Sequence, residues 1–411
     1  MANNIIELPN NVQKAIRSGI GFGKISECMM ELIYNSIDAG STCIAIRFDL
    51  NKFYLQILDN GEGISKDGLK MVGKRYTTSK LKSVRCLEQV PKFCGYKGEA
   101  LCTIIDLSKT CIITSKQEHA KTYQKIFYQG AHHDVLKIKV GRPSKGTSVV
   151  IGGLFYNKPV RQKNFNLFIE VQNMTTSIKN LALIFPKISF SLYDRSKNEY
   201  LLRLASCKTI PDRYNQIYNH NVSKEFTTMR FRHLRDINVS AFFGKFYSNL
   251  KNQQLIFING RQVECKKMQK VLNSHVNDII NDGSLNDSFS LDEKLKECNF
   301  VNFTPDDVLY PVYIINMVCP IYKFIAFVNV SNSIFKIEYN EVFVDIVQNI
   351  VAKLKTNKSV LNSSSSKEDI KLKIDKLDIL ELFHFEEKAH QEKYSKSDEE
   401  QFLENILCQM I

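Results

Sequence analysis

Several patterns that mark common protein classes are missing from this sequence. Its eleven cysteines include no Cys-x-x-Cys pair and no Cys/His spacing typical of a metal site. No apolar run reaches the roughly 18 residues that a membrane-spanning helix needs. The longest candidate, residues 312–330, is broken by Asn316, Pro320 and Lys323 and predicts two core strands. Residues 1–11 show no signal-peptide pattern, so we expect reduced intracellular thiols and no disulfides.

The composition is that of a folded chain with an uneven distribution of charge. Of the 411 residues 44% are hydrophobic, including 26 Phe and 17 Tyr, which is enough for two packed domains and a tail. Residues 358–404 hold 8 of the 56 basic and 12 of the 43 acidic residues, so the rest of the chain has 48 basic and 31 acidic residues, a net charge of +17. Such a basic body either binds a polyanion or is an ordinary solvated surface.

A helix predicted over residues 16–39 carries three polar side chains on one stripe. Apolar residues recur in it at helical spacing, and a Gly-Ser pair ends it. Asn35 and Asp38 follow Glu31 by four and seven residues, so the three lie on the same side of the helix. Glu31 can activate a water molecule as a general base, and the side-chain oxygen of Asn35 can bind Mg²⁺. A polar stripe that faces solvent explains the same spacing.

Two strands with alternating apolar residues are predicted after this helix. They cover residues 44–50 and 53–57, and Asp59 is in phase with the inward side chains of the second strand. A buried carboxylate needs a partner, and Asp59 can accept a hydrogen bond from the exocyclic amine of adenine. Gly61 and Gly63 let the backbone approach a nucleotide closely. The same Asp-Asn-Gly sequence is also typical of a hairpin turn.

A second glycine-rich segment, residues 95–101, leads into a predicted helix. Gly95 and Gly98 are placed like the glycines of a loop that binds phosphate through backbone N–H groups and the helix dipole. Residues 71–98 contain seven basic residues and one acidic residue, and we expect a mobile basic lid in which Lys80 supplies a cation. One Gly-x-x-Gly pair is weak evidence, but the three segments in this order indicate ATP chemistry without a Walker-type loop.

The rest of the chain predicts further strands and helices in two units. The second unit begins near Cys207, and a polar linker begins near Ser363. Strands are predicted over residues 109–128, 146–155, 239–246, 254–263, 310–318 and 325–330, and helices over residues 165–183, 266–280 and 342–355.

The three glycine- and carboxylate-containing segments resemble those of the Bergerat-fold ATPases, which include DNA gyrase B, the 90-kilodalton heat-shock chaperones, histidine kinases and MutL proteins. Residues 154–163 (LFYNKPVRQK) are similar to the MutL segment that follows the ATP site. Residues 257–263 (FINGRQV) are similar to a strand-turn motif of the MutL transducer domain. The resemblance covers roughly residues 12–355. Residues 35–39 and 75–80 look closest to the third eukaryotic MutL homologue.

This resemblance implies a fold and a domain order. The fold class is α/β (α+β). A Bergerat-fold ATPase sandwich of helices on a mixed sheet covers residues 1–206, a smaller transducer domain with a β-α-β unit covers residues 207–355, and a polar acidic tail covers residues 356–411. The family's endonuclease motif, Asp-Gln-His-Ala, is not found after Lys355, so we expect no endonuclease activity from this chain.

The resemblance also implies roles for single residues. Glu31 is the catalytic base, Asn35 the Mg²⁺ ligand and Asp59 the residue that reads adenine. The other nucleotide-binding residues are Asp38, Gly61, Gly63, Thr78, Ser79, Lys80, Gly95, Tyr96, Lys97 and Gly98. Candidates for DNA contact, each of them alone better explained as a surface charge, are Lys158, Arg161, Lys163, Arg230, Arg232 and Arg235.

The sequence departs from the family pattern at two basic residues. The transducer lysine that reaches the γ-phosphate lies in a His-Pro-x-Lys-x-Glu loop, and here the His and Pro are missing and two residues are inserted. Lys336 is therefore either the displaced catalytic lysine or an inert surface lysine. Lys97 replaces the arginine usual in the second glycine loop, which keeps the charge but loses the planar fork of hydrogen-bond donors.

Two functions remain open at this point. The first is a subunit of a MutL-type complex for mismatch repair and meiotic recombination. It binds ATP and Mg²⁺, hydrolyses ATP slowly and clamps double-stranded DNA by ATP-dependent dimerisation. The family implies another MutL homologue as partner, further mismatch repair proteins, a nuclear location and no membrane. The second is a non-hydrolysing interaction subunit that binds ATP only as a conformational ligand.

The basic body leads to a prediction about salt. If the chain binds DNA by neutralising phosphates, the logarithm of its DNA affinity should fall linearly with the logarithm of salt concentration, because each contact releases counterions. Fluorescence anisotropy with a labelled duplex, titrated at low and at physiological salt, measures this slope. An affinity that does not change with salt would contradict DNA binding through these basic residues.

Overall fold

The computed structural model describes most of the chain up to residue 360. The described residues are 22–75, 77, 80, 91, 94–95, 98–139, 141–218, 226–234, 236–248, 251–281, 310–331, 334–337 and 341–360. The chain divides into two compact units, Met1–Ser359 and Val360–Ile411. Most of the predicted lid and of the predicted tail lies outside the described residues. The predicted domain boundary after residue 206 stays a prediction.

The first sheet takes two strands from between the predicted nucleotide segments and the others from the residues that follow them. Its strand order is β5-β4-β3-β7-β2-β1-β8-β9, with β6 beside β4. Most neighbours are antiparallel, but β1 and β8 are parallel, so the sheet is mixed. The strands are β1 (Cys43–Asp49), β2 (Tyr54–Asp59), β3 (Ser108–Lys116), β4 (Tyr123–Tyr128), β5 (Ala131–His132), β6 (Leu136–Lys137), β7 (Gly146–Leu154), β8 (Ser189–Asp194) and β9 (Glu199–Leu204).

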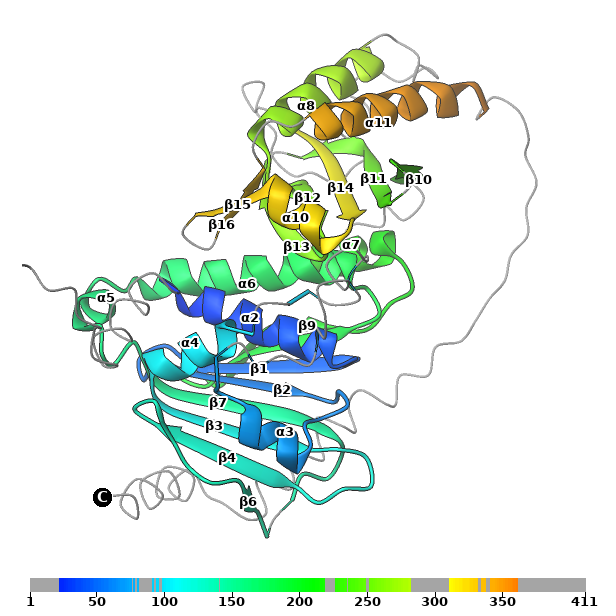
Figure 1. The fold of residues 1–411 in the computed structure, drawn as a ribbon. Coiled ribbons are helices and arrows are strands. Elements are labelled where there is room, and N and C mark those ends of the chain that lie inside the picture. The colour runs from blue at the N-terminus through cyan, green and yellow to red at the C-terminus, as the bar shows by residue number, and fades with distance from the viewer. Residues whose placement is uncertain are drawn as a thin grey trace, which may run out of the picture. The chain divides into compact units, whose positions relative to one another are not determined.

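Helices cover one face of this sheet, as Figure 1 shows for α2, α4 and α6. Apolar side chains at helical spacing on α2, among them Met29 and Ile33, enter a single core with inward side chains of the strands, such as Ile46 and Ile57. The helices of this part are α2 (Ile25–Asp38), α3 (Lys66–Met71), α4 (Ala100–Leu107), α5 (Pro159–Lys163), α6 (Leu167–Ile184) and α7 (Ile210–Tyr218).

A second mixed sheet follows, with the order β10-β11-β14-β12-β13-β16-β15. The pairs β12–β14 and β13–β16 are parallel, and α8 lies between β13 and β14 in the chain, as a β-α-β unit requires. The elements are β10 (Phe226–His233), β11 (Ile237–Ser248), the short helix η2 (Lys251–Gln253), β12 (Gln254–Ile258), β13 (Arg261–Glu264), α8 (Lys266–Asn281), β14 (Tyr310–Val318), α10 (Ile321–Phe327), β15 (Val328–Ser331), β16 (Ile334–Ile337) and α11 (Glu341–Val360).

The second sheet has a core of its own beneath α8 and α11 (Figure 1). Leu272 of α8 and Ile346 of α11 are fully buried there together with Ile315 of β14. In the described part of the chain no helix is long and apolar enough to cross a membrane. The cysteines in that part are all free thiols. The two mixed sheets, each with helices packed on it, confirm the predicted fold class.

The first helix begins later than the sequence pattern predicts. We expected it over residues 16–39. Residues 16–21 lie outside the described residues, Phe22, Gly23 and Lys24 are not helical, and α2 starts at Ile25. The backbone of Lys24 is extended, and the Glu27 carboxylate accepts hydrogen bonds from the N–H groups of Gly23 and Lys24, at 2.7 and 3.1 Å. This carboxylate caps the helix end, which propensity alone does not reveal.

The prediction of two core strands within residues 312–330 is confirmed by β14 and β15, but it missed a helix between them. Residues 321–327 form the helix α10, in which Ile321 and Phe324 are buried while Tyr322 and Ile325 are about half exposed. This is the spacing of a helix with one buried face. The second strand was predicted from residue 325, whereas β15 begins after the helix, at Val328. Pro320 lies directly before the helix, where its missing N–H costs nothing, and its carbonyl accepts from Phe324 N at 3.1 Å.

Several short elements were not predicted. They are α3, α5, α7, η2, β5, β6, β8, β9, β10 and β16. The strands predicted over residues 109–128 are β3 and β4, and the single strand predicted over residues 254–263 is the hairpin β12–β13. The hairpin matters for the site because its turn, Asn259–Gly260, leads directly into Arg261.

The turn between β12 and β13 is held by the side chain of Asn259. Its amide donates to Cys319 O at 3.0 Å, and its carbonyl oxygen accepts from Cys319 N at 2.9 Å. Asn259 and Gly260 both have positive φ, 50° and 77°. Asparagine tolerates this left-handed conformation better than most residues. One side chain thus sets the turn and fastens it to the end of β14.

We predict that Asn259→Ala lowers the free energy of unfolding by about 2–4 kcal/mol, because two partly buried hydrogen bonds are lost and alanine is strained at this φ. Urea unfolding measures the change. The matched control is Asn198→Ala, at an exposed position with a φ of 57°. Its side chain accepts one exposed hydrogen bond, from the Tyr193 hydroxyl, so its loss should cost only about 1–2 kcal/mol. Equal losses in the two variants would contradict a structural role for the Asn259 side chain.

Candidate functional site

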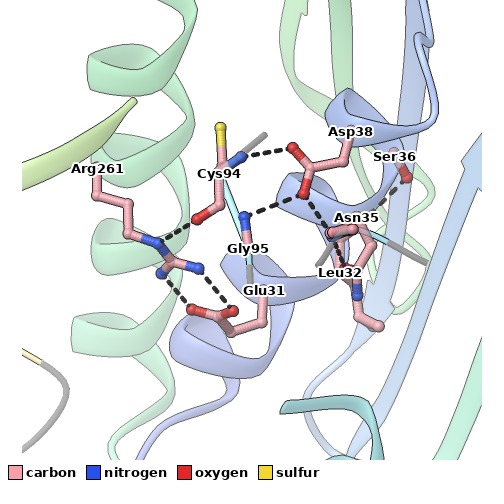
Figure 2. Close-up of polar contacts among 9 residues, drawn as sticks. Glu31, Leu32, Asn35, Ser36, Asp38, Cys94, Gly95 and Arg261 are labelled. Carbon is pink, nitrogen blue, oxygen red and sulfur yellow. Dashed lines mark hydrogen bonds and ion pairs between the residues drawn. The ribbon is translucent and has the colours of Figure 1, made fainter. Parts of the chain in front are cut away.

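The polar stripe predicted on the first helix does not face open solvent. Figure 2 shows Glu31, Asn35 and Asp38 along α2, opposite the segment that holds Cys94 and Gly95. The side chain of Asp38 is only 2% exposed and that of Glu31 20% exposed. Because buried charged groups need partners, the contacts of these three side chains define the site.

Asp38 holds the segment that leads into the second glycine loop. Its Oδ1 accepts from Cys94 N at 2.6 Å and its Oδ2 from Gly95 N at 3.0 Å. Lys80 adds a short ion pair with Oδ2. Two backbone N–H groups and one ammonium thus converge on one carboxylate, which fixes the loop backbone against α2.

Asn35 shares the same lysine. Its side-chain oxygen accepts from Lys80 Nζ at 3.0 Å, so one ammonium bridges Asn35 and Asp38. The oxygen predicted to bind Mg²⁺ therefore already accepts a hydrogen bond from a cation. An amide oxygen has two lone pairs, and the lysine uses one of them. Among the described residues no group of three or more His, Cys, Asp and Glu side chains is arranged to hold a metal. A metal at Asn35 would depend on oxygen atoms that a bound ligand or water supplies.

Glu31, the predicted base, is paired with an arginine from the second sheet. Arg261 Nη1 and Nη2 donate to Glu31 Oε1 and Oε2 at 2.6 and 3.0 Å, and Arg261 Nε donates to the Cys94 carbonyl at 2.8 Å (Figure 2). The guanidinium also lies over the Tyr34 ring, 4.4 Å from its centroid. We did not predict this partner. The only signal for it was the Asn-Gly turn that precedes Arg261 in the transducer-like motif.

Asp59 is buried at the end of β2, as its phase predicted, and it has the partners that a buried carboxylate needs. Its Oδ1 accepts from Gly61 N and Thr147 N at 2.9 and 3.1 Å. Its Oδ2 accepts from Ser36 Oγ at 2.9 Å, and Ser36 lies on α2. Oδ2 keeps one lone pair for another donor. Ser36 and Thr147 were missed because their contacts join distant parts of the chain.

The predicted glycines lie around these carboxylates. Gly61 is buried directly after β2, and a side chain on it would collide with Ser41 Oγ and Ala39 O. A Cβ on Gly95 would lie 3.0 Å from Lys80 Nζ and 3.4 Å from Asp38 Oδ2. Gly63 follows Gly61, and Gly98 stands two residues before α4. Of the other predicted nucleotide contacts, Thr78, Ser79, Tyr96 and Lys97 lie outside the described residues.

The second predicted catalytic residue, Lys336, is exposed on β16. It is in register with Glu264 of β13 and Asn329 of β15. Within the part of the chain that the structure describes, it makes no contact with Glu31. The structure therefore joins Glu31 to Arg261 and leaves Lys336 apart from the α2 stripe.

The candidate DNA-binding residues fall into two groups on separate elements. Lys158, Arg161 and Lys163 belong to α5 and its N-cap, and only Lys163 is clearly exposed. Arg161 donates to Phe22 O at 2.7 Å, so its guanidinium is partly used inside the chain. Arg230 and Arg232 are exposed on β10 of the second sheet. Arg235 lies outside the described residues.

Burial and charge shift the pKa values of three groups at the site. Burial by itself lowers the pKa of the Arg261 guanidinium, but the charge of Glu31 and the bonds to it outweigh this, so the net shift is upward. Burial raises the pKa of the Tyr34 hydroxyl against the opposing charge of Arg261. Burial, with the Asp38 charge, raises the pKa of the Cys94 thiol to about 12. Arg261 therefore stays charged and the two others stay neutral.

Comparison with known proteins identifies the first part of the chain. Residues 24–144 match the family described as histidine kinase-, DNA gyrase B- and HSP90-like ATPase. These residues contain the α2 stripe, Asp59 and both glycine segments. A crystal structure of the N-terminal domain of a DNA repair protein has the same fold, with a TM-score of 0.60 at 20% identity, covering 85% of this chain and 99% of that one.

Two relatives extend the match beyond these residues. The human protein "DNA mismatch repair protein Mlh3" is 36% identical over 262 residues, which are 64% of this chain and 18% of the human one. The MutL protein of Thermodesulfovibrio yellowstonii is 31% identical over 320 residues, which are 76% of this chain and 54% of that protein. The chain thus spans about half or less of the length of these relatives.

The raised pKa of Cys94 leads to a chemical prediction. Because the thiolate is the reactive form, Cys94 should react with iodoacetamide much more slowly than the half-buried Cys43 in the folded chain at mildly alkaline pH. Peptide mass spectrometry after timed quenching measures both rates, and unfolding in urea should bring them together. Equally fast labelling of Cys94 in the folded chain would contradict the burial of this thiol beside Asp38.

Proposed function

Because this chain carries the ATPase region of the MutL family, we propose that it binds ATP with Mg²⁺ and hydrolyses it slowly as a subunit of a DNA mismatch repair complex. The observation that carries the proposal is the placement of three carboxylates on and beside α2. Asp38 accepts from the N–H groups of Cys94 and Gly95, which lead into the second glycine loop. Glu31 is paired with Arg261 beside the Cys94 carbonyl, and Asp59 at the end of β2 is bonded to Ser36 of the same helix.

Asp59 selects the base of the nucleotide. Both of its oxygens already accept hydrogen bonds from the protein, so the carboxylate is fixed in orientation. Its remaining lone pair on Oδ2 accepts from an exocyclic amine, which adenine has at the corresponding position and guanine lacks. Gly61 and Gly63 keep side chains away from the base.

Asn35 and Asp38 organise the phosphate end. When bound, Mg²⁺ neutralises phosphate charge, and Asn35 offers it one amide oxygen. Lys80 bridges Asn35 and Asp38, which supports a cation beside this oxygen. Asp38 holds the backbone before Gly95 in place. Further phosphate contacts are proposed for Gly95, Gly98 and, outside the described residues, Thr78, Ser79, Tyr96 and Lys97.

Glu31 orients a water molecule and accepts its proton. It lies one helical turn before Asn35, so a water held by Glu31 is next to the phosphate end of the site. Its side chain is partly exposed, at 20%, which leaves room for water. A positioned general base of this kind contributes about 10²–10⁴-fold to the rate of a reaction.

The proposal extends to DNA and to partner proteins. The basic residues Lys158, Arg161, Lys163, Arg230, Arg232 and Arg235 contact DNA phosphates. The name of the human relative, a DNA mismatch repair protein, supports a role in DNA repair. A nuclear location and another MutL homologue as partner are proposed with this role. ATP binding brings two such regions together around the DNA, and hydrolysis releases them. Meiotic recombination is proposed on the same grounds.

A second function is favoured by the position of Lys336. If no lysine reaches the γ-phosphate, the chain binds ATP only as a conformational ligand and acts as an interaction subunit. Lys336 is exposed and, in the described part of the chain, does not contact Glu31, which is the observation in favour of this reading.

We predict that Glu31→Ala retains ATP binding and lowers turnover at least about 100-fold, because the proton acceptor is lost while the residues proposed to bind the nucleotide are unchanged. Phosphate release by the purified chain with Mg²⁺ and a fluorescent-ATP titration measure the two quantities. Asn35→Ala is the matched comparison from the same helix and should weaken Mg²⁺-ATP binding itself. Loss of binding in Glu31→Ala would instead make Glu31 a structural residue.

Lys336→Ala, measured alongside, separates the two functions. Lost turnover would establish Lys336 as the displaced catalytic lysine, and unchanged turnover would make it dispensable. An unmodified chain that binds ATP without turning it over would favour the interaction subunit.

A further inference from the structure

The pair between Glu31 and Arg261 joins residues 230 positions apart in the sequence. Glu31 comes from α2, which packs on the first sheet, and Arg261 is the first residue of β13 in the second sheet. Both terminal nitrogens of the guanidinium bond the carboxylate, one to each oxygen. This two-bond geometry fixes both the position and the rotation of the carboxylate, which a single lysine ammonium does not do.

The turn before Arg261 is packed tightly against the nucleotide side of the molecule. A Cβ on Gly260 would lie 2.8 Å from Cys94 Sγ and 3.2 Å from the ring of Phe185. On the other side of Arg261, Gln262 accepts a hydrogen bond from Asn180 of α6 at 3.1 Å. Arg261 is therefore held on both sides by contacts with the first part of the chain, so its position is set by packing.

The guanidinium also connects the base to the phosphate end of the site. Arg261 Nε donates to the carbonyl of Cys94, whose own N–H donates to Asp38. One arginine thus links Glu31, the residue before Gly95 and Asp38. A displacement of the β12–β13 turn would move the base and the second glycine loop together.

Pairing with arginine leaves Glu31 able to act on water. A carboxylate has about four lone-pair positions on its two oxygens, and the arginine fork uses two of them. The side chain of Arg261 is 8% exposed and that of Glu31 is 20% exposed, so the arginine is on the buried side and the carboxylate retains access to solvent. The geometry suits an arginine that holds the base while the base binds water.

We propose that Arg261 is a positioning residue for ATP hydrolysis, which orients Glu31 and makes turnover depend on the docking of the second sheet. This inference rests on the proposed ATPase function. It assigns to Arg261 no contact with the nucleotide, so its loss should affect turnover far more than ATP binding.

The test uses the full chain with Arg261→Lys and Arg261→Ala. We expect kcat to fall about 100-fold, as for small misplacements of a catalytic group, while KM for ATP changes less than about twofold. Millimolar guanidinium should restore part of the turnover of Arg261→Ala, because it can occupy the vacated place beside Glu31. Gly260→Ala should also lower kcat, because its new methyl group displaces the turn from Cys94.

The control is Arg213→Lys. Arg213 is fully buried, but it bonds the backbone carbonyls of Pro186 and Ile188 rather than a carboxylate at the site. The Arg213→Lys variant shows how far the loss of a buried arginine lowers ATP turnover through stability alone. Guanidinium should not change the turnover of this variant.

The outcomes separate this inference from the proposed function. If the unmodified chain hydrolyses ATP and Arg261→Lys hydrolyses it equally well, Arg261 has no positioning role and the inference fails alone. An equal fall in kcat for Arg261→Lys and Arg213→Lys, without rescue by guanidinium, would also overturn it. If the unmodified chain binds ATP but never hydrolyses it, the proposed hydrolysis fails and the role of Arg261 with it.

Discussion

Buried charges must be paired, and α2 places two carboxylates and an amide along a stripe that is largely removed from water. The rest of the site is organised by the need to pair them. Asp38 takes the backbone N–H groups of Cys94 and Gly95, Lys80 bridges Asp38 and Asn35, and Glu31 takes Arg261. Each pairing also fastens another segment of the chain to the same helix. The contacts that pair the polar side chains of α2 therefore also assemble the site.

Two basic residues of the second sheet are candidates for contact with the site, and they differ in kind. Arg261 is buried, bonded at both ends of its guanidinium and placed by a tight turn that Asn259 fixes. Lys336 is exposed on a short strand. The pair of Glu31 and Arg261, whose geometry is set by packing, couples the two sheets. Lys336 makes no contact with Glu31 in the described part of the chain.

The elements that were predicted correctly are those with strong local periodicity. The apolar spacing of α2, the alternation in β1 and β2 and the inward phase of Asp59 all depend on neighbours within one element. The errors arose where a tertiary contact or a helix cap, rather than local periodicity, determined the element or its boundary. The start of α2 is set by the Glu27 carboxylate, and α10 was missed because its exposed residues, Tyr322 and Ile325, are also apolar.

The sequence alone determined the chemical groups of the site and their order, because spacings of three, four and seven residues place side chains on a helix face without any long-range information. It also identified the Asn-Gly turn that precedes Arg261. The tertiary structure decided which groups meet. The pairing of Glu31 with Arg261, and of Asp59 with Ser36 and Thr147, depends on how helices and sheets pack, and no local pattern contains this information. Burial then makes each of these pairings necessary, since an unpaired charge in the same place would cost several kcal/mol.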